Sequence, residues 1–139
     1  MRFHRALVAG ALAVVVAGGG LAVTAAPAQA VTQHTYCGDG DACLYYRINY
    51  GGSMVGIPDQ LVPDYLASPA VLFRTTGDGK GAVVGNQTGS YYNNNGACAL
   101  RVYEHKNYGG RYNTFGQYSG SGNNEFVTRN NNRGHIFCP

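Results

Sequence analysis

Beyond residue 30 the sequence has no apolar run long enough to cross a bilayer, so nothing downstream of that point is predicted to span a membrane. It also lacks an excess of either charge. Removing Arg2 and Arg5 from the 10 basic residues leaves 8, against 7 acidic residues. Such a balance provides no basic surface for nucleic acid or anionic lipid, so neither is an expected partner.

Sequence motifs of the common enzyme classes are missing as well. No Gly-x-Ser-x-Gly, His-Glu-x-x-His or phosphate-loop pattern occurs. The histidines beyond residue 30 (His34, His105 and His135) are far apart in the sequence, and the acidic residues are equally dispersed. We therefore predict no catalytic residues and expect a protein that is not an enzyme.

A sustained helical period is absent too. Prolines interrupt residues 58–70, where only one helical turn would fit, over 59–62 or 64–66. Short β-prone runs recur instead and predict an all-β fold. The expected strands are 43–46, 53–57, 71–74, 82–84, 99–103, 111–115, 125–128 and 134–138. Residues 116–125 are predicted to form a flexible loop, in which substitution of Gly120 should cost little.

Residues 1–30 are predicted to be a secretory signal peptide. They begin with Arg2, His4 and Arg5, continue with an apolar run, and end in the small-x-small site at residues 28–30. The alternative is a membrane anchor, but the run contains three consecutive glycines and no basic cluster follows it. We therefore expect a secreted, extracellular protein whose residues 31–139 form one domain.

The four cysteines, Cys37, Cys43, Cys98 and Cys138, all lie beyond residue 30. An even number in a small exported chain indicates two disulfides, for which three pairings are possible. We favour Cys37–Cys43, because the intervening Gly and Asp residues can turn tightly. Its complement, Cys98–Cys138, would tie the strand at 99–103 to the C-terminal strand.

One eight-residue pattern occurs twice, at residues 45–52 and 103–110. Each copy reads Tyr, four residues, Tyr, one residue, Gly, and each contains Asn-Tyr-Gly-Gly. The repeat predicts two similar hairpin corners in which the last Gly adopts positive φ and the second Tyr lays its ring across the corner. The corner residues are Tyr45, Tyr50 and Gly52 in the first copy, and Tyr103, Tyr108 and Gly110 in the second.

The repeated pattern resembles the Greek-key signature of the βγ-crystallin superfamily, aromatic-x4-aromatic-x-Gly. Each signature opens one Greek key of about four strands, so the resemblance implies a double Greek-key β-sandwich of about eight strands over most of residues 31–139. The export signal, the early Cys pair and the Gly- and Asn-rich second halves are similar to bacterial peptidase inhibitor family 36. The best-known members of that family inhibit metalloproteinases.

The crystallin resemblance also implies a position for calcium. Calcium-binding members resemble Asn/Asp-Asn/Asp-x-x-Ser/Thr-Ser, which corresponds here to residues 86–91 and 131–136. Asn86, Ser90 and Asn131 keep oxygen donors, but neither segment contains a carboxylate, and charge on the ligands largely sets calcium affinity. We expect no tight site, and at most a millimolar one around Asn86 and Ser90.

The family resemblance implies a monomeric inhibitor that fills the cleft of an extracellular peptidase, with a metallopeptidase favoured, through a loop whose rigidity lowers the cost of binding. The loop between Cys37 and Cys43 is the candidate, with Asp39 and Asp41 as its acidic residues. Asp41 could offer a carboxylate to a catalytic zinc. The alternative is that both are ordinary solvated turn acids.

A second functional hypothesis rests on tyrosines that lie among asparagine and glycine. Such residues provide rigid contact area and adaptable hydrogen bonds. They would suit an extracellular binding module or a toxin-like protein that acts at a cell wall or envelope, unless half of them face the core. The residues concerned are Tyr46, Tyr91, Tyr92, Tyr112 and Tyr118.

Overall fold

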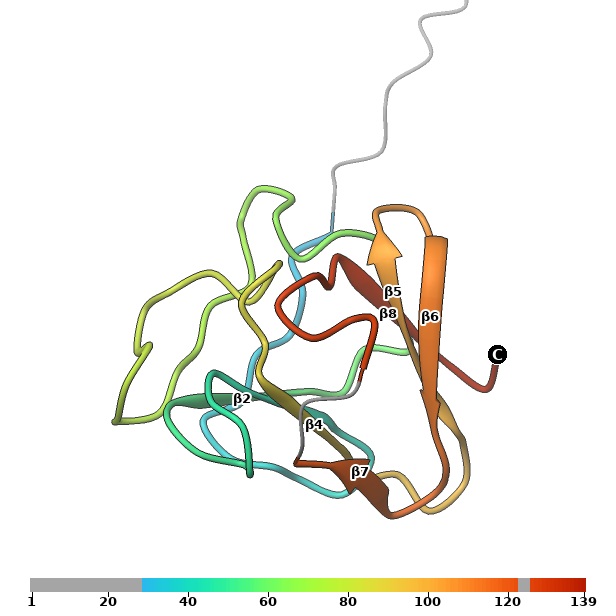
Figure 1. Cartoon of the computed structure of the whole chain (residues 1–139), viewed down its shortest axis with the longest axis horizontal. Helices are drawn as coiled ribbons and strands as arrows, with labels where there is room; N and C mark the ends of the chain where they lie inside the picture. The colour runs from blue at the N-terminus through green and yellow to red at the C-terminus, as the bar shows by residue number, and fades with distance from the viewer. Residues whose placement is uncertain (1–28, 123–125) are drawn as a thin grey trace, which may run out of the picture.

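The computed structural model describes residues 29–122 and 126–139, which form eight β-strands and no helix (Figure 1). The strands are β1 (Ala42–Tyr45), β2 (Met54–Ile57), β3 (Leu61–Val62), β4 (Ser90–Asn93), β5 (Leu100–His105), β6 (Gly109–Phe115), β7 (Ser119–Ser121) and β8 (Gly134–Phe137). Every pairing between them is antiparallel. The predicted all-β class is therefore confirmed.

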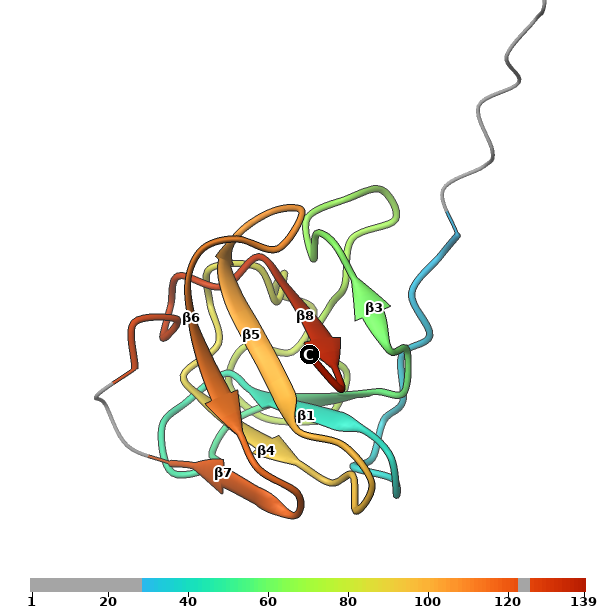
Figure 2. The same cartoon turned by 90° about the vertical axis from the view of Figure 1, so that its right-hand side faces the viewer.

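The strands form two four-stranded sheets. Sheet A has the order β2-β1-β4-β7, and sheet B has the order β3-β8-β5-β6. Figure 2 shows sheet B in front, with β1, β4 and β7 of sheet A below it. Together the two sheets make a β-sandwich, as the sequence predicts.

Each half of the chain contributes one strand to the sheet of the other half. The first half supplies β1, β2 and β4 to sheet A, but its β3 pairs with β8 in sheet B. The second half supplies β5, β6 and β8 to sheet B, but its β7 pairs with β4 in sheet A. Neither half of the chain completes a sheet alone, so each sheet contains strands from both halves.

The core lies between the inner faces of the two sheets. Alternation along the strands explains its composition: Ala42 and Leu44 of β1 and Leu100 and Val102 of β5 are all fully buried. The same cluster contains aromatic residues from both sheets and from the loops, namely Tyr65, Phe73, Tyr91, Phe115 and Phe137. The hydrophobic core is therefore shared by both halves of the chain.

The two repeated signatures form equivalent hairpin corners. The ring of Tyr50 lies 5.5 Å from that of Tyr45, and the ring of Tyr108 lies 5.7 Å from that of Tyr103, both edge to face. Gly52 and Gly110 have positive φ values of 73° and 76°, as the spacing predicts. Each corner also contains an Asn and a Tyr with positive φ, namely Asn49 and Tyr50 in the first corner and Asn107 and Tyr108 in the second. The sequence predicts positive φ only for the glycines.

Both favoured disulfides are present. Cys37 is bonded to Cys43 and Cys98 to Cys138, with Cα atoms 5.5 and 4.8 Å apart. Cys98 lies two residues before β5, and Cys138 follows β8 directly. The second bond therefore closes the end of sheet B, where Cys138 also donates a backbone hydrogen bond to Ala99 O at 3.0 Å.

Several predicted elements were wrong. Residues 61–62 of the expected helical turn form β3, whose pairing with β8 removes the need for local hydrogen bonds. The strands expected over 71–74 and 82–84 are reduced to one isolated bridge between Leu72 and Val83. A strand was also expected over 125–128. Glu125 lies outside the described residues, and residues 126–128 form a turn. Conversely, β4 lies in a Gly- and Asn-rich stretch where no strand was predicted.

The loop predicted over residues 116–125 contains β7, and this overturns the expectation for Gly120. A Cβ at Gly120 would lie 2.3 Å from Tyr91 O and 2.8 Å from the Cα of Tyr92. The strand pairing requires the glycine here, because β7 approaches β4 closely at this point.

The predicted signal peptide, residues 1–30, lies outside the described residues except for its last two. In the part of the chain that the structure describes, no helix has the length and apolar character needed to cross a membrane.

A buried polar network joins the segment around β3 to β8. His135 is fully buried; its Nε2–H donates to Asp59 O at 3.0 Å, and its Nδ1 accepts from the Tyr65 hydroxyl at 2.7 Å. Burial lowers the pKa of His135 to about 4, because a charged imidazolium would lose its hydration there. The network therefore requires a neutral His135.

The corner glycines give a first prediction. Gly52→Ala and Gly110→Ala should each destabilise the protein by about 1–3 kcal/mol, because a side chain is forced into the left-handed region. Gly109→Ala is the matched control, since its nearest neighbour would be an ordinary 3.4 Å away and its φ is not positive. Urea unfolding of the three variants measures the difference. Equal losses at all three positions would contradict a conformational requirement at the corners.

The buried histidine gives a second prediction. The folded pKa of about 4 lies below the unfolded value of about 6.5, so the unfolded chain binds the proton first as pH falls. The contribution to stability is complete above about pH 6.5 and should decline by about 3 kcal/mol towards pH 4. Denaturant unfolding at a series of pH values should show this loss in the parent protein and in His105→Gln, which changes an exposed histidine. His135→Gln should flatten the profile above pH 4, and an unchanged slope in that variant would contradict the assignment.

Candidate functional site

Asp41, one of the two candidate inhibitory acids, is a buried structural residue. Its side chain is 1% exposed, and its Oδ2 accepts hydrogen bonds from Gly38 N at 2.8 Å and His34 Nδ1 at 3.0 Å. The carboxylate therefore points inward and holds the Cys37–Cys43 loop against the preceding segment. In this conformation it cannot reach a zinc ion outside the protein, so that part of the hypothesis is not supported by the geometry.

Asp39, by contrast, lies exposed in the same loop. The Tyr118 hydroxyl donates to its Oδ1 at 3.4 Å, and Tyr118 itself is 58% exposed. Tyr36, which directly precedes the loop, is 60% exposed and stacks on His34 with ring centres 4.9 Å apart. The loop and its neighbours thus present one exposed carboxylate and two exposed tyrosine rings, each of which contacts a neighbouring side chain.

Asn94 attaches the loop to the end of β4. Its amide nitrogen Nδ2 donates to Gly38 O at 2.7 Å and to Cys37 O at 3.3 Å. Its backbone N–H donates to Asp41 O at 2.9 Å, and its carbonyl accepts from Gly40 N at 2.8 Å. One residue therefore makes four hydrogen bonds to the small disulfide ring.

The two neighbouring asparagines hold the loops on either side. Asn93 is fully buried, and its Nδ2 donates to Cys98 O and Gly116 O, both at 2.8 Å. Asn95 Oδ1 accepts from the backbone N–H of Ala97 at 2.8 Å and of Cys98 at 3.0 Å. The backbone N–H of Tyr118 donates to Asn95 O at 3.4 Å. The three consecutive asparagines thus join three loops.

We call residues 36–41, 94–98 and 116–118 the clamped loop cluster. They lie together along the lower edge of Figure 2, where β1 begins and β4 and β6 end. The cluster contains one cysteine of each disulfide, Cys37 and Cys98, and exposes Tyr36, Asp39, Ala97, Gln117 and Tyr118. Rigid aromatic and acidic groups on constrained loops are suited to recognising a protein partner.

The sequence indicates Asp39, Asp41 and Tyr118 as candidate site residues, whereas the hydrogen-bonding roles of the three asparagines were not predicted. The signal was available in the run of three Asn before Gly96, because Asn side chains readily bond the backbone of the residues that follow them. Of the other tyrosines proposed for recognition, Tyr91 is fully buried in the core, whereas Tyr112 is 52% exposed on sheet B. These tyrosines therefore do not form one surface.

The two segments compared with calcium loops hold each other. Asn86 N donates to Asn132 O at 2.8 Å, and Asn130 N donates to Thr88 O at 2.9 Å, in a symmetric arrangement. Their side chains add a buried bond of 3.0 Å from Asn132 Nδ2 to Thr88 Oγ1. These hydrogen bonds between the two segments therefore connect the first half of the chain to the second.

The structure also corrects the alignment of these segments. Ser90 lies opposite Tyr45, and Gly134 lies opposite Tyr103, so Gly134 occupies the position of Ser90. The counterpart of Asn86 is therefore Asn130, one residue before the predicted Asn131, and both residues have positive φ. A serine hydroxyl is missing from the second loop in this alignment.

The surroundings of these loops are unsuited to tight binding of a cation. Ser90 Oγ donates to Arg47 O at 2.7 Å and accepts from Tyr50 N at 3.0 Å, so the hydroxyl is already engaged. The hollow beside Asn86 and Asn131 contains one carboxylate, that of Glu104, together with Lys106 and Arg133. Among the described residues no group of three His, Cys, Asp or Glu side chains could hold a metal ion.

Glu104 is already paired with a cation of the protein. Arg111 donates to it through Nη2 at 2.8 Å and Nε at 3.1 Å, and Asn131 Nδ2 donates to the same carboxylate. These hydrogen bonds from Arg111 lower the pKa of Glu104 to about 2, so it is ionised at neutral pH. A calcium ion would have to displace this guanidinium.

Comparisons with known proteins agree with this architecture. The sequence profile of peptidase inhibitor family I36 matches residues 30–115, which include the Cys37–Cys43 loop and the loop at 94–98. No curated protein sequence matches the chain. A solved structure described as "Evolution of the eye lens beta-gamma-crystallin domain fold" is similar over 78% of this chain and 96% of its own, with a TM-score of 0.57 and 11% identity. At that identity the likeness shows the fold alone, a double Greek key of the βγ-crystallin type.

The third prediction concerns calcium. A site with a Kd of about 1 mM, half occupied at about 1 mM calcium, would stabilise the protein by only about 0.4 kcal/mol. The melting temperature should therefore rise by no more than about 3 °C in 1 mM calcium. Magnesium at the same concentration is the control. Micromolar affinity in a calorimetric titration would show that backbone oxygens compensate for the missing carboxylates and would contradict the prediction.

Proposed function

Because the chain belongs to peptidase inhibitor family I36, we propose that it is a secreted inhibitor that inserts the clamped loop cluster into the cleft of an extracellular peptidase. A metallopeptidase is the favoured target, and the inhibitor acts as a monomer without catalysis of its own. Export through the predicted signal peptide would place it in the same compartment as its target. The observation that best supports this proposal is that Asn94 makes four hydrogen bonds to the small disulfide ring.

Rigidity supports this proposal, because the ordering of a flexible loop is a major cost of association. In the clamped loop cluster the ordering is completed during folding. Asp41 fixes the inside of the disulfide ring, Asn94 fixes its outside, and Tyr118 spans from the neighbouring loop to Asp39. A peptidase would therefore meet loops that are already held by these contacts before binding.

The exposed chemistry of the cluster supports a zinc-dependent target. A catalytic zinc keeps one coordination position open, and an exposed carboxylate is a suitable ligand for it. Asp39 is the acidic residue of the cluster that is exposed, whereas Asp41 is 1% exposed. Asp39 therefore takes the role of zinc-directed carboxylate, and Tyr36 and Tyr118 supply aromatic contacts beside it.

The fourth prediction tests this assignment. Protein collected from the medium of secreting cells should inhibit a thermolysin-like zinc peptidase in a titration and leave a serine peptidase unaffected. Tyr36→Ala, Asp39→Asn and Tyr118→Ala should each raise the inhibition constant by about 10-fold or more. Tyr112→Ala is the matched control, because Tyr112 is similarly exposed but lies on sheet B.

These outcomes distinguish two questions: whether the protein inhibits a peptidase, and which surface of the protein carries the inhibition. If the parent protein inhibits but the three substitutions have no effect, another surface carries the inhibition. If no peptidase is inhibited and the protein is instead retained on cell-wall polysaccharide, the inhibitor proposal fails and the binding-module alternative replaces it. Circular dichroism melts of every variant show whether a loss of inhibition reflects unfolding.

A further inference from the structure

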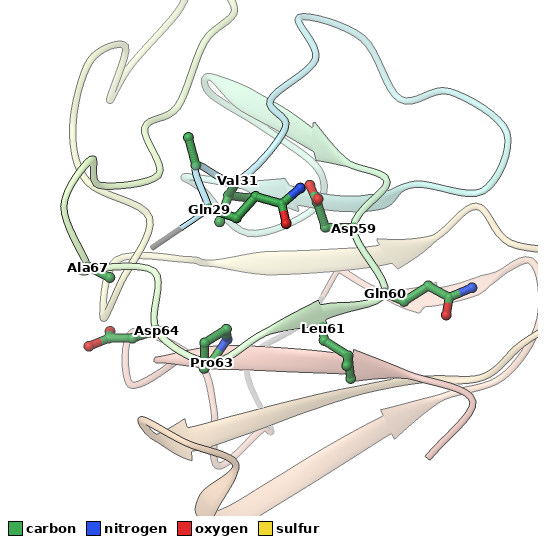
Figure 3. A pocket seen from close by; sticks show the side chains of 9 residues that line it. Gln29, Val31, Asp59, Gln60, Leu61, Pro63, Asp64 and Ala67 are labelled. Atoms are coloured by element: carbon green, nitrogen blue, oxygen red, sulfur yellow. The ribbon is translucent and has the colours of Figure 1, made fainter. Parts of the chain in front are cut away.

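A pocket of about 390 Å³ lies between the first described residues and the segment around β3 (Figure 3). Gln29, Ala30 and Val31 form one side, and Asp59, Leu61 and Pro63 are among the residues on the other. In Figure 3 the side chain of Gln29 extends across the pocket towards the carboxylate of Asp59. The predicted signal-peptide cleavage point, between Ala30 and Val31, thus lies within the pocket lining.

Asp59 differs from most acidic residues of the described chain because it has no basic partner there. Asp41, Asp64, Asp78 and Glu104 each pair with a histidine or an arginine. Asp59 instead accepts a hydrogen bond at Oδ2 from the backbone N–H of Thr32 at 2.7 Å. A carboxylate without a cation therefore lies against the second residue after the predicted cleavage point.

The groups on both sides of this contact are fixed. The backbone oxygen of Asp59 accepts from the buried His135, which in turn is bonded to Tyr65. On the opposite side the side chain of Val31 is partly buried and packs against the hydrophobic core. The backbone nitrogen of Val31 precedes that of Thr32 by one residue, a Cα step of about 3.8 Å. Asp59 is thus held beside the backbone at Val31.

We propose that hydrolysis of the Ala30–Val31 bond during export creates a new ammonium group at Val31 and that this group pairs with Asp59. One water is consumed and the C–N bond breaks; Ala30 leaves with the carboxylate, and the amine of Val31 takes up a proton. In the uncut chain the same nitrogen is a neutral amide. The pocket is thus a binding site for the protein's own processed terminus.

This pairing would link stability to processing. A hydrogen bond between two charged groups is stronger than one to a neutral amide, because charge adds to the attraction. Loss of residues 29 and 30 also opens the pocket and allows the ammonium group to approach the carboxylate. The exported form would therefore be more stable than the precursor, and it would gain this stability where it acts.

The fifth prediction uses the full chain, exported by cells and purified from the medium. Its first residue, by amino-terminal sequencing, should be Val31. Insertion of Gly-Ser between residues 30 and 31 displaces the new terminus by two residues and should lower Tm by about 4–8 °C. Asp59→Asn keeps an acceptor for Thr32 N–H but removes the charge, and it should lower Tm by a similar amount. The two changes together should cost no more than either alone.

Asp78→Asn is the matched control, because Asp78 is an exposed acid on another loop, and its effect should add to that of the insertion. An unchanged Tm after the insertion, additive losses with Asp59→Asn, or a first residue other than Val31 would each overturn the proposal.

If Asp59→Asn does not fold, NMR of the parent chain after ¹³C reductive methylation measures the pKa of the Val31 amine. Of the two acidic residues that line the pocket, Asp59 lies beside the terminus, whereas the side chain of Asp64 points away from the pocket in Figure 3 and pairs with Arg133. The pKa of the Val31 amine should lie above the ordinary range of about 7.7–8.0, and a value within that range would count against the pairing.

Discussion

The exchange of β3 and β7 between the two sheets is the constraint on which the rest of the structure depends. Each sheet has three strands from one half of the chain and one strand from the other. Equivalent bonds lock both exchanged segments to the repeated corners: Asn49 N donates to Gly122 O at 2.6 Å, and Asn107 N to Pro63 O at 2.8 Å. The positive-φ corners therefore aim their backbone N–H groups at the strand that arrives from the other half. The exchange of β3 and β7 thus both joins the two sheets and makes the two halves of the chain structurally similar.

The clamped loop cluster follows from this exchange. Its first two loops flank β1 and β4 of the first half, but its third loop reaches them only because β7 joins sheet A beside β4. Tyr118 immediately precedes β7 and is thereby placed against Asn95 and Asp39. The clamped loop cluster cannot form in this way on one isolated Greek key, because its third loop comes from the second half of the chain.

The sequence predicts this fold where local chemistry repeats and fails where partners are distant. The corners and the disulfides carry their own signals, whereas β4 lies in a polar stretch and owes its pairing to β1 and β7. The alignment of the calcium-like loops failed for a related reason. The corners are 58 residues apart (103 − 45), but Ser90 and Gly134 are 44 apart (134 − 90), so the first half holds 14 more residues between corner and loop. Likewise, burial distinguishes Asp41 from Asp39, and no local pattern encodes that difference.

The two exchanged strands are held in different ways, and this difference indicates where the protein is sensitive to its surroundings. β3 has two residues and β7 has three, so neither ladder contributes many hydrogen bonds. The segment of β3 is fixed by ionisable side chains instead: His135 bonds Asp59 O, and Arg133 pairs with Asp64 at 2.8 Å. β7 is fixed by backbone groups and by Tyr118. A change in charge on the β3 side, such as a new chain terminus beside Asp59, therefore acts on that segment directly and reaches the clamped loop cluster only through the shared core. The cluster has one ionisable contact of a similar kind, between the buried Asp41 and His34, and this contact lies at the other end of its disulfide ring from β7 and Tyr118 in the chain order of the loops.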